Sequence, residues 1–89
     1  VMSVYLVSYD FRAPRKDYAP LHAHLKTYAW AKPLESLWFI KTDLSAKALG
    51  TAVANHMDGD DKLVVVDVGS DAAWKNIPND VASWIQKNL

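Results

Sequence analysis

Three short apolar runs constrain the fold of this chain more than any other feature. They are Val1–Phe11, Trp30–Thr42 and Lys62–Val68, and each is rich in β-branched and aromatic residues, which is typical of strands. Apolar residues recur at helical spacing in three other places, namely Tyr18–Ala29, the segment after Ser45, and the segment from Asn79 onward. This alternation predicts one domain over residues 1–89 that mixes strands and helices.

The middle apolar run leaves two folds open. If Trp30–Thr42 is one bent strand, the chain forms a small parallel βαβαβ sheet. If it is two short strands, the result is a ferredoxin-like βαββαβ layout, an α+β sandwich with an added C-terminal helix. The residues alone leave both folds open, with the parallel sheet as the alternative to the ferredoxin-like one. Asp17, either Asp43 or Ser45, and Asn79 are the predicted N-caps of the three helices.

The strands are apolar on both faces. Val4 and Leu6 alternate with Val7 in the first strand, and Val64 alternates with Val65 in the last. A strand of this kind is normally buried on both sides, yet the two crossover helices of a ferredoxin-like fold cover only one. The C-terminal helix or a second copy of the chain must cover the other face. We therefore expect a homodimer packed through its sheets.

Composition excludes several classes of function. The 89 residues include no cysteine and three glycines, and the formal net charge is zero. Disulfides, cysteine nucleophiles and glycine-rich phosphate loops are therefore excluded, and zero charge argues against coating nucleic acid by bulk electrostatics. No stretch approaches the roughly 20 apolar residues of a membrane span. Val1–Tyr9 lacks the features of a signal peptide, so we expect a cytoplasmic protein.

Charge is uneven along the chain. Residues 1–50 hold seven basic and four acidic side chains, whereas residues 51–89 hold three basic and six acidic ones. The densest basic cluster is Arg12, Arg15 and Lys16, directly after the first strand. A solvated loop is the ordinary interpretation of such a cluster.

Most other chemistry-bearing residues favour structural roles. His22 and His24 lie about 200° apart on a helix, so they point in different directions and are expected at a surface or interface. His56 is expected near the end of the second helix, where its charge suits the dipole. The acidic run Asp58–Asp61 predicts a solvated turn. Core or interface anchors are the expected role of the four tryptophans, Trp30, Trp38, Trp74 and Trp84.

Asp10 is the main candidate for chemistry. It ends the first apolar strand, and strand ends are where active-site residues often lie in α/β sheets. A carboxylate there could hold a divalent ion, and the basic cluster beside it could hold phosphates. In a two-fold dimer the two copies of Asp10 could also meet and form a paired-carboxylate metal site. The alternative is a turn aspartate that accepts backbone N–H bonds.

These segments resemble two groups of known proteins. Tyr5–Phe11 followed by Arg15-Lys16 resembles the opening of the CRISPR-associated Cas-two proteins, and Ser36-Leu37-Trp38 is similar to their second motif. A longer likeness is to small bacterial proteins of the SinR family. It runs through Tyr9-Asp10, Leu34-Glu35-Ser36, Trp38, Lys41–Ser45 and Asp60-Asp61.

The resemblance implies a ferredoxin-like homodimer. For the Cas-two proteins it implies a dimer that bridges an integrase on DNA, and in some members a metal-dependent nuclease whose aspartate matches Asp10. The related VapD-type toxins are associated with RNA cleavage. The leading hypothesis is a dimer acting on DNA or RNA, in which Asp10 binds Mg²⁺ or Mn²⁺ as the catalytic residue. Arg12, Arg15 and Lys16 would position the phosphates.

A second hypothesis comes from a different class. In it the chain is a non-catalytic dimeric adaptor that binds a partner protein or nucleic acid, and Asp10 only caps a turn. This hypothesis predicts no metal-dependent activity.

Overall fold

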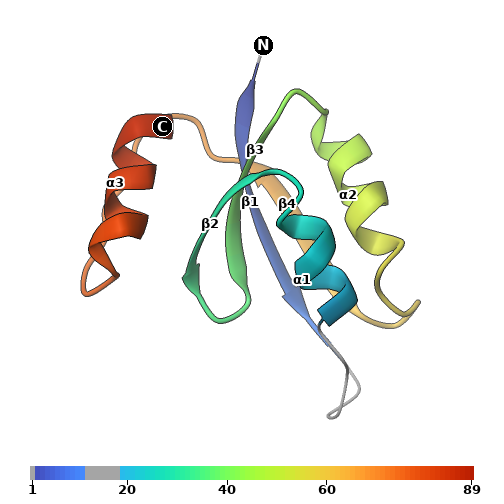
Figure 1. Ribbon diagram of the computed structural model, residues 1–89. Helices are drawn as coiled ribbons and strands as arrows, with labels where there is room; N and C mark the ends of the chain where they lie inside the picture. Colours follow the sequence, from blue (N-terminus) through green and yellow to red (C-terminus); the bar gives the residue numbers. More distant parts are fainter. Residues whose placement is uncertain (1, 12–18) are drawn as a thin grey trace.

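The computed structural model describes residues 2–11 and 19–89, and it is an α+β fold with a four-stranded antiparallel sheet (Figure 1). The elements in chain order are β1 (Ser3–Asp10), α1 (Ala19–Leu25), β2 (Ala29–Leu34), β3 (Leu37–Thr42), α2 (Ala46–Ala54), β4 (Lys62–Asp67) and α3 (Asn79–Asn88). The strand order is β2-β3-β1-β4, and every neighbouring pair is antiparallel. The parallel alternative is therefore wrong.

The middle apolar run consists of two strands. β2 and β3 form a hairpin whose two-residue connection is Glu35-Ser36. The carbonyl oxygen of Ser36 accepts a hydrogen bond from the Tyr9 amide at 3.3 Å, which joins this hairpin to β1. Pro33 lies in β2, which is an edge strand. Its missing N–H therefore removes no hydrogen bond from the centre of the sheet.

The main core lies on one face of the sheet, beneath α1 and α2 (Figure 1). Trp38, Ile40 and Val7 are 0% exposed, and they meet Leu49 of α2 and Leu25 of α1, which are equally buried. Burying an aliphatic side chain of this size stabilises the fold by about 1.5–3 kcal/mol. The face of β1 that carries Tyr5, Val7 and Tyr9 therefore points to the helices.

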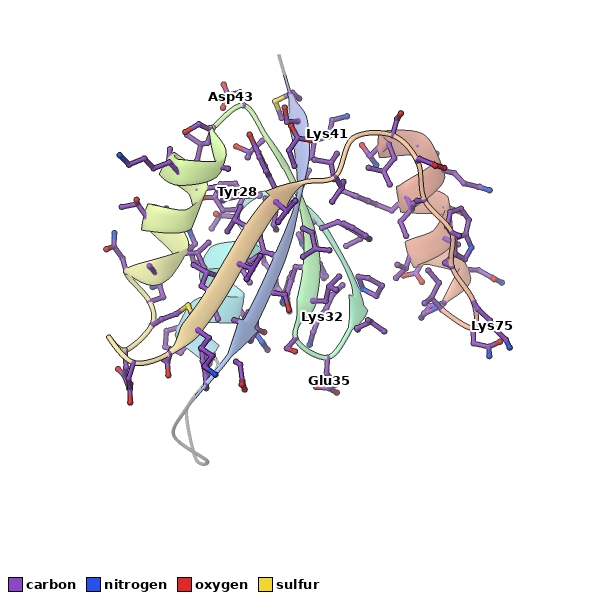
Figure 2. The ribbon with its side chains drawn as sticks, turned by 180° about the vertical axis from the view of Figure 1, so that it is seen from behind. Tyr28, Lys32, Glu35, Lys41, Asp43 and Lys75 are labelled. Carbon is purple, nitrogen blue, oxygen red and sulfur yellow. The ribbon has the colours of Figure 1, made fainter. Side chains whose placement is uncertain are left out.

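The C-terminal helix covers part of the opposite face. The Phe39 and Trp84 rings stack with centroids 6.4 Å apart, and the Lys41 ammonium donates to Oδ1 of Asn88 at 3.1 Å. Ile85 is 4% exposed. Seen from behind, α3 stands beside the hairpin, away from β4 (Figure 2). The β2–β3 half of this face is thus covered within one chain.

Two predicted helix boundaries are wrong. α1 ends at Leu25, and Ala29 already belongs to β2. The hydroxyl of Thr27 donates to the His24 carbonyl at 2.7 Å, so it satisfies one of the last carbonyl groups and ends the helix. The N-cap of α3 is Pro78, and Asn79 is its first helical residue. The expected cap at Asp17 lies outside the described residues.

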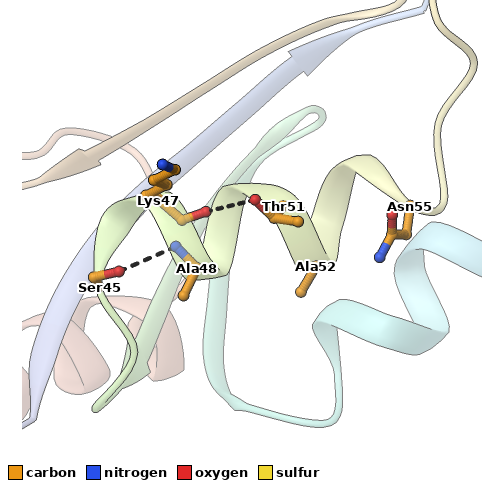
Figure 3. A pocket seen from close by; sticks show the side chains of 6 residues that line it. All are labelled: Ser45, Lys47, Ala48, Thr51, Ala52 and Asn55. Carbon is orange, nitrogen blue, oxygen red and sulfur yellow. Dashed lines mark hydrogen bonds between the residues drawn. The ribbon is translucent and has the colours of Figure 1, made fainter.

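Of the two predicted N-caps of the second helix, Asp43 and Ser45, the structure has Ser45. The hydroxyl of Ser45 accepts a hydrogen bond from the Ala48 amide at 3.1 Å (Figure 3). One turn on, the Thr51 hydroxyl donates to the Lys47 carbonyl at 2.9 Å. Ser45 therefore satisfies one of the free amides of the first turn.

Candidate functional site

Asp10 is exposed at the end of β1, as the sequence predicts. Lys62 stands directly opposite it on β4 in the sheet register, so both side chains lie on the same face of the sheet. Both residues line a shallow hollow of about 150 Å³ together with Ser8 and Val64. Strand alternation puts Asp10 on the same face as Leu6, which is the face opposite α1 and α2.

Among residues 2–11 and 19–89, Asp10 is not part of a cluster of three or more possible metal ligands. Mg²⁺ takes six oxygen ligands and is usually held by one or two carboxylates together with waters and substrate phosphates. The predicted phosphate-binding residues Arg12, Arg15 and Lys16 lie outside the described part of the chain.

The acidic turn is the one cluster of three possible metal ligands in the described ranges. Asp58, Asp60 and Asp61 each offer a carboxylate oxygen, all within 4.8 Å of one another. A carboxylate oxygen of Asp61 accepts the Asp58 amide at 2.8 Å, which closes the turn. The cluster is at the surface and has the geometry of the predicted turn.

Sequence reasoning missed a polar network beside Asp10. Tyr9 is 6% exposed, and its hydroxyl lies 3.0 Å from Nε2 of His22 and accepts from Nε1 of Trp38 at 3.2 Å. Burial lowers the pKa of His22, and the charges of Lys32 and Lys26 lower it further. Residues from β1, α1 and β3 form this network, so neighbouring positions in the sequence give no signal for it.

The other two histidines meet between α1 and α2. The rings of His24 and His56 stack with centroids 4.5 Å apart, and Nε2 of His24 lies 3.1 Å from the Tyr28 hydroxyl. Burial and the neighbouring His56 charge lower the pKa of His24. His22 and His24 contact different partners, as their predicted divergence on the helix requires.

The second face of the sheet remains open over β4, whereas on β1 Val4 is buried and Leu6 is half-buried. Val64 and Val66 are 55% and 48% exposed, and Leu6 stands opposite Val66 in the register. By contrast, Val65 and Leu63 alternate with them and pack against the core. The predicted two-faced character of β4 is confirmed, and one of its apolar faces is uncovered in the single chain.

The tryptophans divide between core and surface. Trp38 is fully buried, as expected of a core anchor. Trp30 and Trp74 are 38% and 40% exposed, and Trp84 is half-buried on α3. The expected core role is therefore confirmed for Trp38. The exposure of Trp30 and Trp74 has no explanation in the core of this chain.

A hollow on the outer surface of α2 has no carboxylate or histidine among its lining residues. It is lined by Ser45, Lys47, Ala48, Thr51, Ala52 and Asn55 (Figure 3). All of these belong to one helix or its caps, and the hydroxyl groups of Ser45 and Thr51 already bond to the backbone.

Comparisons with family models, with curated proteins and with solved structures found no match to this chain. The likeness to SinR-family and Cas-two proteins therefore rests on the sequence motifs. In the described ranges, every helix is too short or too polar to cross a membrane.

Proposed function

We propose that this chain is a cytoplasmic, ferredoxin-like protein that forms a homodimer through the open half of its sheet and binds nucleic acid as a non-catalytic adaptor. The strand order β2-β3-β1-β4 and the two helices on one face are compatible with a ferredoxin-like βαββαβ fold. The sequence likeness to the Cas-two and SinR groups supports both the dimer and the nucleic-acid partner.

The observation that carries the dimer is the open apolar strip on β1 and β4. Val64 and Val66 stand next to each other on the open face of β4 at 55% and 48% exposure, and Leu6 continues the strip onto β1. Contiguous exposed apolar surface rimmed by polar residues marks an interaction site. A two-fold packing of two such strips covers the same residues on both copies.

Sedimentation equilibrium tests the dimer. The wild-type chain should sediment at twice the 10.0 kDa of one protomer. Val64→Lys and Val66→Lys should shift the mass toward 10.0 kDa, because a charge would then be buried without a partner. Ala48→Lys, on the exposed outer surface of α2, is the matched control and should stay dimeric. A monomeric wild type contradicts the proposal.

A metal-dependent nuclease is the second candidate, and the position of Asp10 favours it. Its carboxylate is exposed at the end of β1 on the same face as the open strip. A face-to-face dimer could therefore bring two copies of Asp10 together, and Mg²⁺ or Mn²⁺ held there would activate water against a phosphodiester. Arg12, Arg15 and Lys16 would bind the phosphates.

A cleavage panel separates the two candidates. Single- and double-stranded DNA and RNA are incubated with Mg²⁺, Mn²⁺ or EDTA, beside Asp10→Asn. Metal-dependent cutting that the variant loses while remaining dimeric would establish the nuclease. Absence of cutting, or cutting that Asp10→Asn retains, would leave the adaptor.

A further inference from the structure

A groove of about 550 Å³ runs between the edge strand β2 and the C-terminal helix. It is lined by Trp30, Ala31, Lys32, Pro78, Asp80, Val81 and Trp84. Two tryptophans from segments more than fifty positions apart thus border one open groove. β2 pairs with β3 on one side only, so its other main-chain edge faces this groove.

Both tryptophans are braced from the inside of the protein. The Trp30 ring contacts the fully buried Trp38, with centroids 5.1 Å apart. The Trp84 ring stacks on Phe39 with an interplanar angle of 10°. A side chain held in this way loses little freedom when a planar ligand stacks on it. Trp30 nevertheless keeps 38% of its surface exposed.

The charges around Trp30 suit a phosphate. The ammonium group of Lys26 lies over the Trp30 ring, 5.3 Å from its centroid, so a base that stacks on this ring meets the lysine directly, and Lys32 forms part of the groove wall. The charges of both lysines reach His22 strongly enough to lower its pKa. Asp80, on the α3 side, is exposed and offers acceptor oxygens to the N–H groups of a base.

We infer that this groove binds single-stranded nucleic acid, with a nucleobase stacked on the exposed part of Trp30 at the edge of β2 and phosphates on Lys26 and Lys32. Aromatic side chains beside basic ones are the usual means of holding single strands, because every base has a stacking face. A duplex keeps its bases stacked inside and cannot insert one without unpairing it. DNA and RNA share the required chemistry.

This inference rests on the proposed nucleic-acid function and is compatible with the proposed dimer. The groove borders β2 at one edge of the sheet, and the open strip lies on β1 and β4 toward the opposite edge. A dimer that covers Val64 and Val66 therefore leaves Trp30 accessible.

Fluorescence anisotropy with labelled single strands tests the groove. Oligo-dT and oligo-U of about twelve nucleotides are titrated with the full chain in EDTA, so that cleavage plays no part. Trp30→Ala should weaken binding of at least one strand by about fivefold or more, since stacking contributes about 1–3 kcal/mol per base. Trp74→Ala removes an equally exposed tryptophan outside this groove and should leave binding unchanged.

A lysine pair provides a second, independent variant. Lys26→Ala combined with Lys32→Ala should weaken binding and flatten its salt dependence, because fewer counterions are released. Lys75→Ala is the matched exposed control. Binding that survives both Trp30→Ala and the lysine pair would overturn the groove and leave the nucleic-acid function standing. Failure of the wild type to bind either strand would overturn both, whereas the sedimentation result would be unaffected.

Discussion

At the scale of single residues, Tyr9 connects three elements through its hydroxyl group. The oxygen accepts from the buried Trp38 indole and pairs with the His22 ring, while the Tyr9 ring stacks on Phe11 with centroids 5.3 Å apart. These contacts hold the strand end that carries Asp10 against α1. The position of the candidate site therefore depends on a residue that does not belong to it.

Tyr9→Phe should destabilise the protein by about 1–3 kcal/mol, because it leaves the Trp38 N–H buried without this acceptor. Urea unfolding followed by tryptophan fluorescence measures the change. Tyr28→Phe, which removes a less buried hydroxyl that pairs with His24, is the comparison and should cost less. Equal losses would contradict the special role of the Tyr9 hydroxyl.

Two histidines should make stability depend on pH. The pKa values of His22 and His24 are lowered from 6.5 in the folded protein, so the unfolded chain binds protons more readily. Their contribution to stability is complete above pH 6.5 and is lost as the pH falls through 6.5 toward the lower folded values. Urea titrations between about pH 7.5 and pH 5.5 should show this decline.

The matched variant replaces both rings with uncharged amides. His22→Gln combined with His24→Gln should be less stable than wild type near neutral pH and should lose part of the decline. A variant that retains the full wild-type slope would show that other groups, such as carboxylates, cause the pH dependence.

At the scale of elements, α2 depends on its cap. Ser45→Ala removes the hydroxyl that accepts the Ala48 amide, and it should destabilise the protein by about 0.5–2 kcal/mol. Thermal unfolding by circular dichroism measures the change. Ser83→Ala, on the exposed side of α3, has no capping role and should be neutral or slightly stabilising. A Ser45→Ala variant as stable as wild type would contradict the cap.

Most elements follow from local patterns in the sequence. Alternation of apolar residues predicts the strands, but both faces of β1 and β4 are apolar, so the sequence does not say that Val7 and Val65 belong to the core side. The end of α1 could not be predicted as well, because Tyr28 continues the helical spacing while the Thr27 side chain closes the helix. The cap of α3 is Pro78, so no side-chain hydrogen bond marks that boundary.

The candidate site is less predictable because it depends on register and on distant contacts. The sequence places Asp10 at a strand end, and the structure agrees. The position of Lys62 opposite Asp10 requires the register of β4 against β1. The groove between Trp30 and Trp84 requires knowing that α3 lies beside β2, and nothing local in either segment specifies this.

At the scale of the whole molecule, the apolar second face is divided in two. α3 covers the half over β2 and β3 within the chain, and in our proposal a second copy covers the half over β1 and β4. The sequence allowed either solution for the entire face. The C-terminal helix explains one half, so the proposed dimer needs to explain only the strip that includes Val64 and Val66.

A dimer of this kind links folding to association. The melting temperature should rise with protein concentration, because the folded state binds a second copy and the unfolded state does not. Val64→Lys should melt at a temperature independent of concentration. Differential scanning calorimetry over a wide concentration range measures both, and a wild-type melting temperature that does not change would argue against the dimer.

The most direct measurement is the solvent accessibility of the valine methyl groups, read by nuclear magnetic resonance with a soluble paramagnetic agent. Val53 is 0% exposed and Leu44 is 36% exposed, so they supply protected and accessible references in the same sample. If the dimer forms, Val64 and Val66 are protected like Val53, despite their exposure in the single chain. Methyl groups that relax as fast as those of Leu44 at high protein concentration would show that nothing covers this strip, and the proposed dimer would be wrong.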